Sequence, residues 1–219
     1  MEEYKVYFVS DLHISHKNIL KHSPNRIKAF NLNGEDDIKK HDEEIINMWL
    51  SMTKRNDHIY VLGDFIMTNK EETKKILNIL KSNGCKIHLI QGNHDKSLKG
   101  LDNYFESVDL LKNVKFKKTM FNFIEEEYFE VVMCHYPMKS WFNKPRGSMN
   151  LYGHIHDNAP YVDTETDDLC LNVGLDCLHM NYKLISLEEI YKYYKSKLNG
   201  LTPEEYIEKV TKENNKFIR

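Results

Sequence analysis

Five short segments of the chain each end an apolar, strand-like run in side chains that bind metal ions. They are Asp11-x-His13, Gly63-Asp64, Gly92-Asn93-His94-Asp95, His135 and Gly153-His154-x-His156. Because ligands gather outside the strand ends of an α/β sheet, we expect these side chains to converge on one edge. Carboxylates, imidazoles and an amide, with no cysteine pair nearby, favour Mn, Fe, Co, Ni or Zn over a cysteine-based zinc site. A carboxylate such as Asp64 can bridge two ions about 3.5–4 Å apart, the spacing of two-metal hydrolases.

This ordered set of motifs resembles the calcineurin-like metallophosphoesterase superfamily over most of the chain. The order of the five motifs is highly specific, whereas any single motif would be weak. The resemblance implies two divalent transition-metal ions, for which we expect Mn before Fe, Ni, Co or Zn. The ligands that it implies for one ion are Asp11, His13, Asp64 and His156. Those that it implies for the other ion are Asp64, Asn93, His135 and His154.

The resemblance also implies catalytic roles and a fold. His94 would be the proton donor or charge stabiliser at the scissile phosphate, and Asp95 would orient the His94 ring. A hydroxide bridging the two ions would attack phosphorus in line. The fold that it implies is α/β, a four-layer α/β/β/α sandwich with two mixed sheets.

The second motif departs from one branch of the superfamily. Phosphoprotein phosphatases carry Gly-Asp-x-x-Asp-Arg, in which the arginine binds phosphate, but this chain reads Gly63-Asp64-Phe65-Ile66-Met67-Thr68. The difference argues against protein phosphatase activity and favours the small bacterial and phage-type phosphoesterases. We therefore expect a hydrolase of phosphate esters, and a phosphodiesterase acting on cyclic or short nucleotides before a phosphomonoesterase.

Several further residues are candidates for substrate contacts. The opening string is similar to a family subgroup that reads Asp-x-His-x-x-His-x-Asn-Ile, which makes His16 and Asn18 candidates beside Asn93. Arg26 could supply the missing phosphate clamp, because guanidinium groups pair bidentately with phosphate oxygens. The alternative for Arg26 is a solvated charge in a loop. Trp141 could stack on a flat leaving group or simply anchor its loop.

Other polar residues have a structural interpretation that is at least as good. Asn172 and Asp176 either approach the site or form hydrogen bonds at the end of a strand. We favour the second interpretation. An isolated histidine is usually a surface group or a satisfied core group. We therefore assign no role to His22, His41, His58, His88 and His179.

Hydrophobic periodicity predicts the elements that position these residues. Strands are expected at 5–10, 59–62, 86–91, 114–118, 120–124, 128–135, 150–152, 170–174 and 183–186. Helices are expected from Asp36 to Leu50 and from Glu71 to Leu80. Capping patterns at Ser186 and Thr202 predict two more. We expect one domain over residues 1–219, with the C-terminal helices at about 186–219 packed on it.

Composition limits the function classes. The chain has 219 residues, 41% hydrophobic content and a net charge of −2, so it can form one sizeable core but gives no support to a large nucleic-acid surface. It shows no apolar run long enough to span a bilayer and no leader-like start, which predicts a cytoplasmic protein with reduced cysteines. We expect a small phosphate-ester or nucleotide substrate, no long nucleic acid and no membrane partner. The oligomeric state stays open.

Two rival classes share these motifs. A nuclease of the double-strand-break repair type would normally add a DNA-cradling domain and long coiled-coil contacts, and the sequence has neither. A non-catalytic scaffold such as the metallophosphatase-like subunit of retromer would lose ligands or the histidine of Asn-His-Asp, and here all are present.

Overall fold

The computed structural model describes residues 4–156, 169–206 and 208–209, and its strands form two sheets. The first sheet contains β1 (Val6–Val9), β2 (His58–Val61), β3 (Lys86–Ile90), β4 (Ser107–Asp109) and β9 (Ile185–Ser186). Its order is β4-β3-β2-β1-β9, in which β1 to β4 run parallel and β9 pairs antiparallel with β1. Each parallel strand therefore delivers the residues that follow it to the same edge.

The second sheet contains β5 (Leu111–Lys117), β6 (Tyr128–Cys134), β7 (Met149–Tyr152) and β8 (Cys170–Asn172) in this order. β5 and β6 form an antiparallel pair, while β6, β7 and β8 are parallel. Both sheets are thus mixed, as the sequence predicts.

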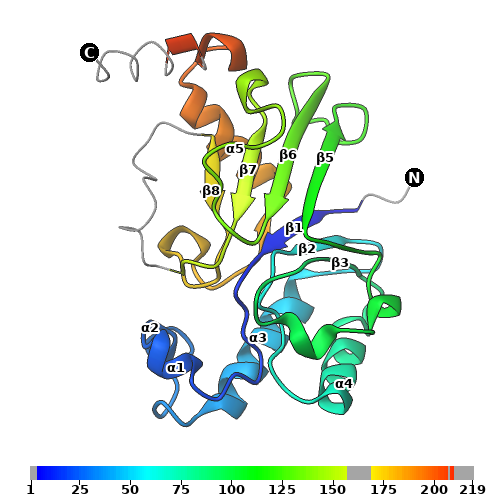
Figure 1. The fold of residues 1–219 in the computed structure, drawn as a ribbon, viewed down its shortest axis with the longest axis vertical. Coiled ribbons are helices and arrows are strands. Elements are labelled where there is room, and N and C mark those ends of the chain that lie inside the picture. The colour runs from blue at the N-terminus through cyan, green and yellow to red at the C-terminus, as the bar shows by residue number, and fades with distance from the viewer. Residues whose placement is uncertain (1–3, 157–168, 207, 210–219) are drawn as a thin grey trace.

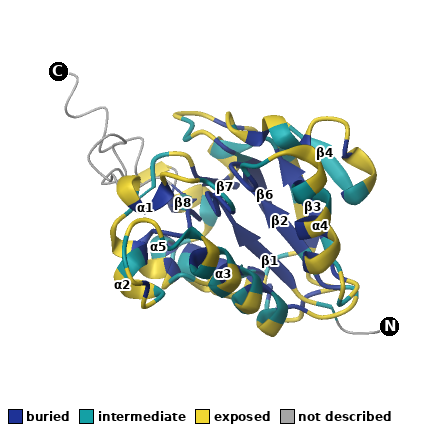
Figure 2. Ribbon diagram, turned by 90° about the horizontal axis from the view of Figure 1, so that it is seen from below, coloured by how far each residue is buried: buried dark blue, intermediate teal, exposed yellow. Residues whose placement is uncertain are grey.

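Helices flank the two sheets (Figures 1 and 2). Below the first sheet lie α3 (Ile38–Met52) and α4 (Lys70–Leu80), and α5 (Leu187–Leu198) passes behind the second sheet. α3 is amphipathic and buries His41, Ile45 and Trp49 along one face. The side chain of Asn69 caps α4 by accepting a hydrogen bond from the backbone of Glu72.

Aromatic contacts join the second sheet to its neighbours. Phe116 on β5 lies edge-on to Phe8 on β1 and Tyr60 on β2, so these rings pack between the sheets. Phe129 on β6 lies directly opposite Phe116 in the strand register, and its ring contacts Tyr191 and Tyr194 of α5. Two mixed sheets with flanking helices confirm the predicted α/β/β/α fold.

The two sheets are joined at one corner. Ser10, directly after β1, forms a parallel bridge with Gly174, which follows β8. The N–H of Ser10 donates to the carbonyl of Val173 at 2.8 Å, and the N–H of Leu175 donates to the carbonyl of Ser10 at 3.0 Å. The carboxyl ends of strands from both sheets therefore meet at this corner.

The structure differs from the prediction at a few elements: one predicted strand is wrong, and several short elements are not predicted. Residues 120–124 are not a strand but part of the turn between β5 and β6, where the buried side chains of Phe121 and Ile124 anchor the connection. The predicted loop after β1 contains two short helices, α1 (Ile19–His22) and α2 (Asn25–Ala29). β4 was not predicted, because three half-buried residues give no clear period.

The tail follows the capping signals within the described residues. Ser186 and Glu189 form a capping box at the start of α5. Thr202 and Glu205 make the same reciprocal pair of bonds, at 3.2 and 2.8 Å, ahead of helical residues 203–206. Residues 210–219 of the predicted second tail helix lie outside the described residues. In the part of the chain that the structure describes, no helix has the length and apolarity needed to cross a membrane.

Candidate metal centre

Two groups of metal-binding side chains lie at the corner where the sheets meet. One group contains Asp11, His13 and His156, and the other contains Asp64, His135 and His154. Within each group, one ligand atom from each residue lies within 4.8 Å of the others. Each of these residues follows β1, β2, β6 or β7, so the strand ends bring the predicted ligands together.

The carboxylate of Asp64 lies between the two groups. Its Oδ2 is 3.8 Å from Nε2 of His13, and its Oδ1 is 3.6 Å from Nε2 of His135. This is the placement expected of a bridging ligand. Asn93 belongs with the second group, because its Oδ1 lies 3.0 Å from Nε2 of His135.

Five of the ligand residues have left-handed backbone conformations, which are uncommon outside glycine. The φ angles are 57° for Asp11, 52° for His13, 52° for Asp64, 72° for His154 and 50° for His156. Such strain costs about 1–3 kcal/mol per residue and persists only where the surroundings fix it. Hydrogen bonds from the N–H groups of Asp11 and His13 to the carbonyls of Gly63 and Asp64, at 3.1 and 2.9 Å, provide part of that support.

Two glycines let the ligand loops approach closely. A Cβ at Gly92 would overlap the Asp64 carboxylate, and a Cβ at Gly153 would overlap Ser10 and the Asp11 carboxylate. Any side chain at these positions would separate the loops. The glycines of the Gly-Asn-His-Asp and Gly-His-x-His motifs are therefore a requirement of the packing.

The donor set fits two divalent metal ions. Asp11 is fully buried, and its Oδ1 has no hydrogen-bond partner among the described residues. A buried carboxylate oxygen without a partner is costly, and burial raises the pKa of this carboxyl despite nearby His156 and His135. The Nε2 atoms of His13 and His156 lie 3.2 Å apart and 3.9 and 3.8 Å from this oxygen. An ion at this point would satisfy the carboxylate oxygen and both imidazole nitrogens.

Hydrogen bonds fix the imidazoles in the form that binds metals. Nδ1 of His135 donates to the carbonyl of Leu62 at 2.7 Å, and Nδ1 of His156 donates to Oδ2 of Asp176 at 2.6 Å. The proton on Nδ1 leaves the Nε2 lone pair free for a ligand. Burial, with Arg26 and His156 nearby, lowers the pKa of His13 to about 2, so this ring is neutral as well.

The Asn93-His94-Asp95 segment has a different internal arrangement from the one expected. The His94 side chain is exposed at the site, with its ring centroid 6.0 Å from that of His13. Asp95 is buried and accepts hydrogen bonds from the backbone N–H groups of Asp64, Phe65 and Gly92, at 3.1, 2.9 and 2.7 Å. No hydrogen bond within the described residues joins it to the His94 ring. Asp95 therefore holds the ligand loops together rather than orienting His94 directly.

His16 borders the same side of the site as His94. Its ring centroid lies 5.4 Å from that of His13, 6.4 Å from that of His94 and 6.0 Å from that of His22. Its Nδ1 is buried and has no hydrogen-bond partner in the described part of the chain. Asn18 is exposed at the start of α1 and makes no side-chain capping bond. The structure thus brings the His16 ring beside the ring of His13, whereas no side-chain hydrogen bond of Asn18 is found among the described residues.

Arg26 is not a phosphate clamp. The side chain is completely buried, and its guanidinium donates to the carboxylate of Asp176 and to the backbone carbonyls of Leu12 and Asp11. It was expected in an exposed loop, but α2 carries it into the interior behind the first motif.

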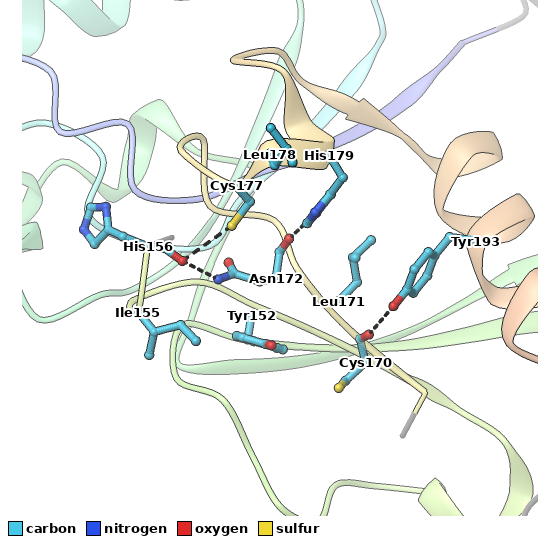
Figure 3. A pocket seen from close by; sticks show the side chains of 10 residues that line it. All are labelled: Tyr152, Ile155, His156, Cys170, Leu171, Asn172, Cys177, Leu178, His179 and Tyr193. Carbon is cyan, nitrogen blue, oxygen red and sulfur yellow. Dashed lines mark hydrogen bonds between the residues drawn. The ribbon is translucent and has the colours of Figure 1, made fainter. Parts of the chain in front are cut away.

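Two residues near the end of β8 support His156. Asp176 holds its ring, and Asn172 donates from Nδ2 to its carbonyl at 2.9 Å. Figure 3 shows this backbone contact beside a cavity of about 330 Å³ lined by Tyr152, Leu171 and Tyr193 among others, with the His156 ring directed away from it. The sequence allowed for an approach by Asn172 and Asp176 but favoured strand-end hydrogen bonds. The sequence feature that indicates their approach to the site is their position after a strand, which they share with the predicted ligands.

Trp141 anchors its loop. Its ring is 7% exposed, and its indole N–H donates to the carbonyl of Ser148 at 2.9 Å. Of the two interpretations of Trp141, the structure shows the loop anchor. Tyr136 is an aromatic residue next to the centre, with its ring centroid 4.7 Å from that of His154.

Comparisons with known proteins agree with this geometry. The family model described as calcineurin-like phosphoesterase matches residues 4–158. An uncharacterised protein of Methanocaldococcus jannaschii is 27% identical over 192 residues, which cover 86% of this chain and 90% of the relative. The Gene 66 protein of Mycobacterium phage L5 is 23% identical over 205 residues, covering 84% and 91%. The crystal structure of a protein of unknown function from Aquifex aeolicus aligns with a TM-score of 0.64 at 25% identity, covering 87% of this chain and 99% of that one.

Proposed function

Because the chain belongs to the calcineurin-like phosphoesterase family, and is thus a hydrolase of phosphoester bonds, we propose that it is a phosphodiesterase for small substrates such as cyclic or short nucleotides. The family generally binds two divalent metal ions. The two groups of ligands described above would hold them, with Mn as the proposed metal.

The burial of Arg26 is the observation that supports a diester. A phosphomonoester carries a charge of about −1.5 to −2 at pH 7. A phosphodiester has a single ionisable oxygen and is a monoanion. A site that binds monoesters gains from an extra cation such as arginine. Arg26 is directed inward to Asp176, while the rings of His16, His94 and Tyr136 lie beside ligand histidines. These groups suit a monoanion better than a dianion.

The protein groups around the phosphate would have separate tasks. When bound, two divalent ions supply Lewis acidity and lower the pKa of water. His94, exposed beside His13, would donate a proton to the leaving oxygen. Asn93 would present its amide N–H to a phosphoryl oxygen while Oδ1 stays with the second ligand group. His16 and Tyr136 would contact the two substituents of the diester.

Hydrolysis of two model esters tests the proposal. Protein stripped of metal and reloaded with Mn is assayed on bis-p-nitrophenyl phosphate and on p-nitrophenyl phosphate. Asp64→Ala is the variant that lacks the carboxylate between the two ligand groups, and Asp102→Ala, at an exposed acidic residue outside both groups, is the matched control.

We expect metal-dependent turnover with the diester preferred, lost in Asp64→Ala and kept in Asp102→Ala. Preference for the monoester would overturn the diester assignment. Turnover of long DNA with a steep decline as salt rises would instead indicate a nuclease, because counterion release dominates such binding.

A further inference from the structure

A chain of hydrogen-bonded side chains runs from α3 to the metal ligand His156. Nδ1 of His41 lies 2.9 Å from Oδ1 of Asp42, and Nε2 of His41 lies 3.0 Å from Nη1 of Arg26. Nε of Arg26 donates to Oδ1 of Asp176, whose Oδ2 accepts the bond of 2.6 Å from His156. We call Asp42, His41, Arg26 and Asp176 the Arg26 network.

The protons of this network have one consistent arrangement. A guanidinium only donates, so Nε2 of His41 must accept and the proton of His41 sits on Nδ1, facing Asp42. Burial lowers the pKa of His41, which keeps the ring neutral. Asp176 accepts from Arg26 on Oδ1, and from His156 and the Ser23 hydroxyl on Oδ2. Nδ1 of His156 must therefore carry a proton, so Nε2 is the nitrogen that faces Asp11 and His13 and would bind an ion.

The same network holds the backbone of the first motif. Arg26 donates to the carbonyls of Leu12 and Asp11 at 2.9 and 2.6 Å. The carboxylate of Asp42 accepts from the backbone N–H of Ser15 at 2.9 Å and from its hydroxyl at 3.0 Å. Asp11, His13 and Ser15 all have positive φ angles, between 52° and 65°. The strained loop is therefore bonded to the network at both ends.

Burial of the Arg26 guanidinium is energetically unfavourable by itself. Removing an ion from water costs several kcal/mol, and a buried ion pair often stabilises a fold no better than apolar residues of the same size. Arg26 and His41 are completely buried, yet their contacts converge on one ligand group. Within the described residues, no hydrogen bond of the network reaches His135 or His154.

We propose that the Arg26 network is a positioning device that sets the affinity of the ion held by Asp11, His13 and His156, and leaves the Asp64, His135 and His154 group intact. This inference shares with the proposed function the premise that the centre binds two ions. It makes no use of the substrate.

The test counts bound ions. Asp176→Asn keeps the shape of the side chain but presents an amide N–H to either Arg26 or His156, so one bond is lost or the His156 proton moves. Asp57→Asn is the matched control, because Asp57 is equally buried and accepts backbone hydrogen bonds from Lys5 and Lys54 at 2.7 and 2.8 Å. Mn binding to each protein is measured by titration calorimetry and elemental analysis. The Mn electron paramagnetic resonance spectrum then distinguishes a coupled pair from a single ion.

In the wild type and in Asp57→Asn we expect two ions and the spectrum of a coupled pair. In Asp176→Asn one ion should bind as before and the other about 10–100-fold more weakly, with a single-ion spectrum at limiting Mn. Two ions at wild-type affinity in Asp176→Asn, or equal weakening of both, would overturn the proposal.

A second pair of variants covers the case in which Asp176→Asn does not fold. In His41→Gln the amide can accept from Arg26 and donate to Asp42, whereas His41→Leu can do neither. We expect His41→Gln to recover most of the affinity that His41→Leu loses for one ion, and equal affinities would contradict the network. A wild type that binds two ions but hydrolyses no diester would contradict the proposed function alone.

Discussion

The backbone N–H of His94 donates a hydrogen bond of 2.9 Å to Oδ1 of Asp64. The exposed imidazole proposed as proton donor is thus attached through the main chain to the carboxylate that lies between the two ligand groups. Changes to the His94 side chain leave this bond in place.

We expect His94→Gln to retain both metal ions and to lower kcat by about 10²–10⁴-fold, the usual contribution of general acid catalysis. Asp64→Asn should lose metal, because it removes the carboxylate that faces both ligand groups. Metal content and turnover are measured on the same preparations. Comparable metal loss in both variants would argue against a separate role for His94.

Asp95→Asn should weaken the fold and the metal centre together. Asp95 accepts three backbone hydrogen bonds. In asparagine an NH₂ group replaces one carboxylate oxygen, so it faces at least one backbone N–H and that hydrogen bond is lost. We expect a loss of about 1–3 kcal/mol in the free energy of unfolding, with reduced metal content. Urea denaturation of the metal-free protein measures the first and elemental analysis the second. Lys96→Ala, at the exposed next residue, is the control and should change neither.

Gly153→Ala should be far more damaging than Gly34→Ala. A Cβ at Gly153 overlaps Ser10 and Asp11, whereas a Cβ at Gly34 has no atom within 4 Å. Overpacking of this kind costs about 1–3 kcal/mol, and here it also displaces a ligand. The readouts are the free energy of unfolding and the number of Mn ions bound. Unchanged Mn binding in Gly153→Ala would show that the loops can separate without consequence.

The contact between α5 and the β5–β6 turn should depend on pH. Glu126 accepts hydrogen bonds from Tyr191 and Lys195, at 2.6 and 3.0 Å. Burial alone would raise the pKa of Glu126, but Tyr191 and Lys195 hold it below the ordinary value of 4.5. Stability from this group is therefore fully present above pH 4.5 and is lost as the pH falls through the lower folded pKa.

Glu126→Gln should accordingly be less stable than the wild type at neutral pH, by about 1 kcal/mol or less because solvent screens the pair. The difference should shrink as the pH falls below 4.5. Denaturation of metal-free protein from about pH 7 to about pH 3 measures it. Glu127→Gln, at an exposed neighbour, should show no such trend, and a constant difference for Glu126→Gln would contradict the pKa direction.

Side-chain types and strand ends were enough to predict that the metal-binding side chains converge, whereas the two ligand sets and the four-layer sandwich were implied by the family resemblance. Asp11, Asp64 and His135 each follow an apolar run, and the convergence of parallel strand ends brings them together without further information. Arg26 and Asp95 could not be assigned in the same way. Both make most of their contacts inside the protein with residues far away in sequence, and no local pattern distinguishes a buried arginine or aspartate from an exposed one.

The sequence pattern also fails to predict short elements correctly. β4 is too short to show alternation, and residues 120–124 carry enough apolar side chains to resemble a strand while serving as anchors of a turn. In both cases tertiary packing decides the outcome over local propensity.

The bridge between Ser10 and Gly174 has a consequence for biosynthesis. A ribosome-bound chain that ends before residue 174 can pair β1 with β2 but lacks the partner of Ser10 in this bridge. Closure of such a long loop is entropically costly and slow, so this junction of the two sheets forms after the pairing of strands that are nearer in sequence.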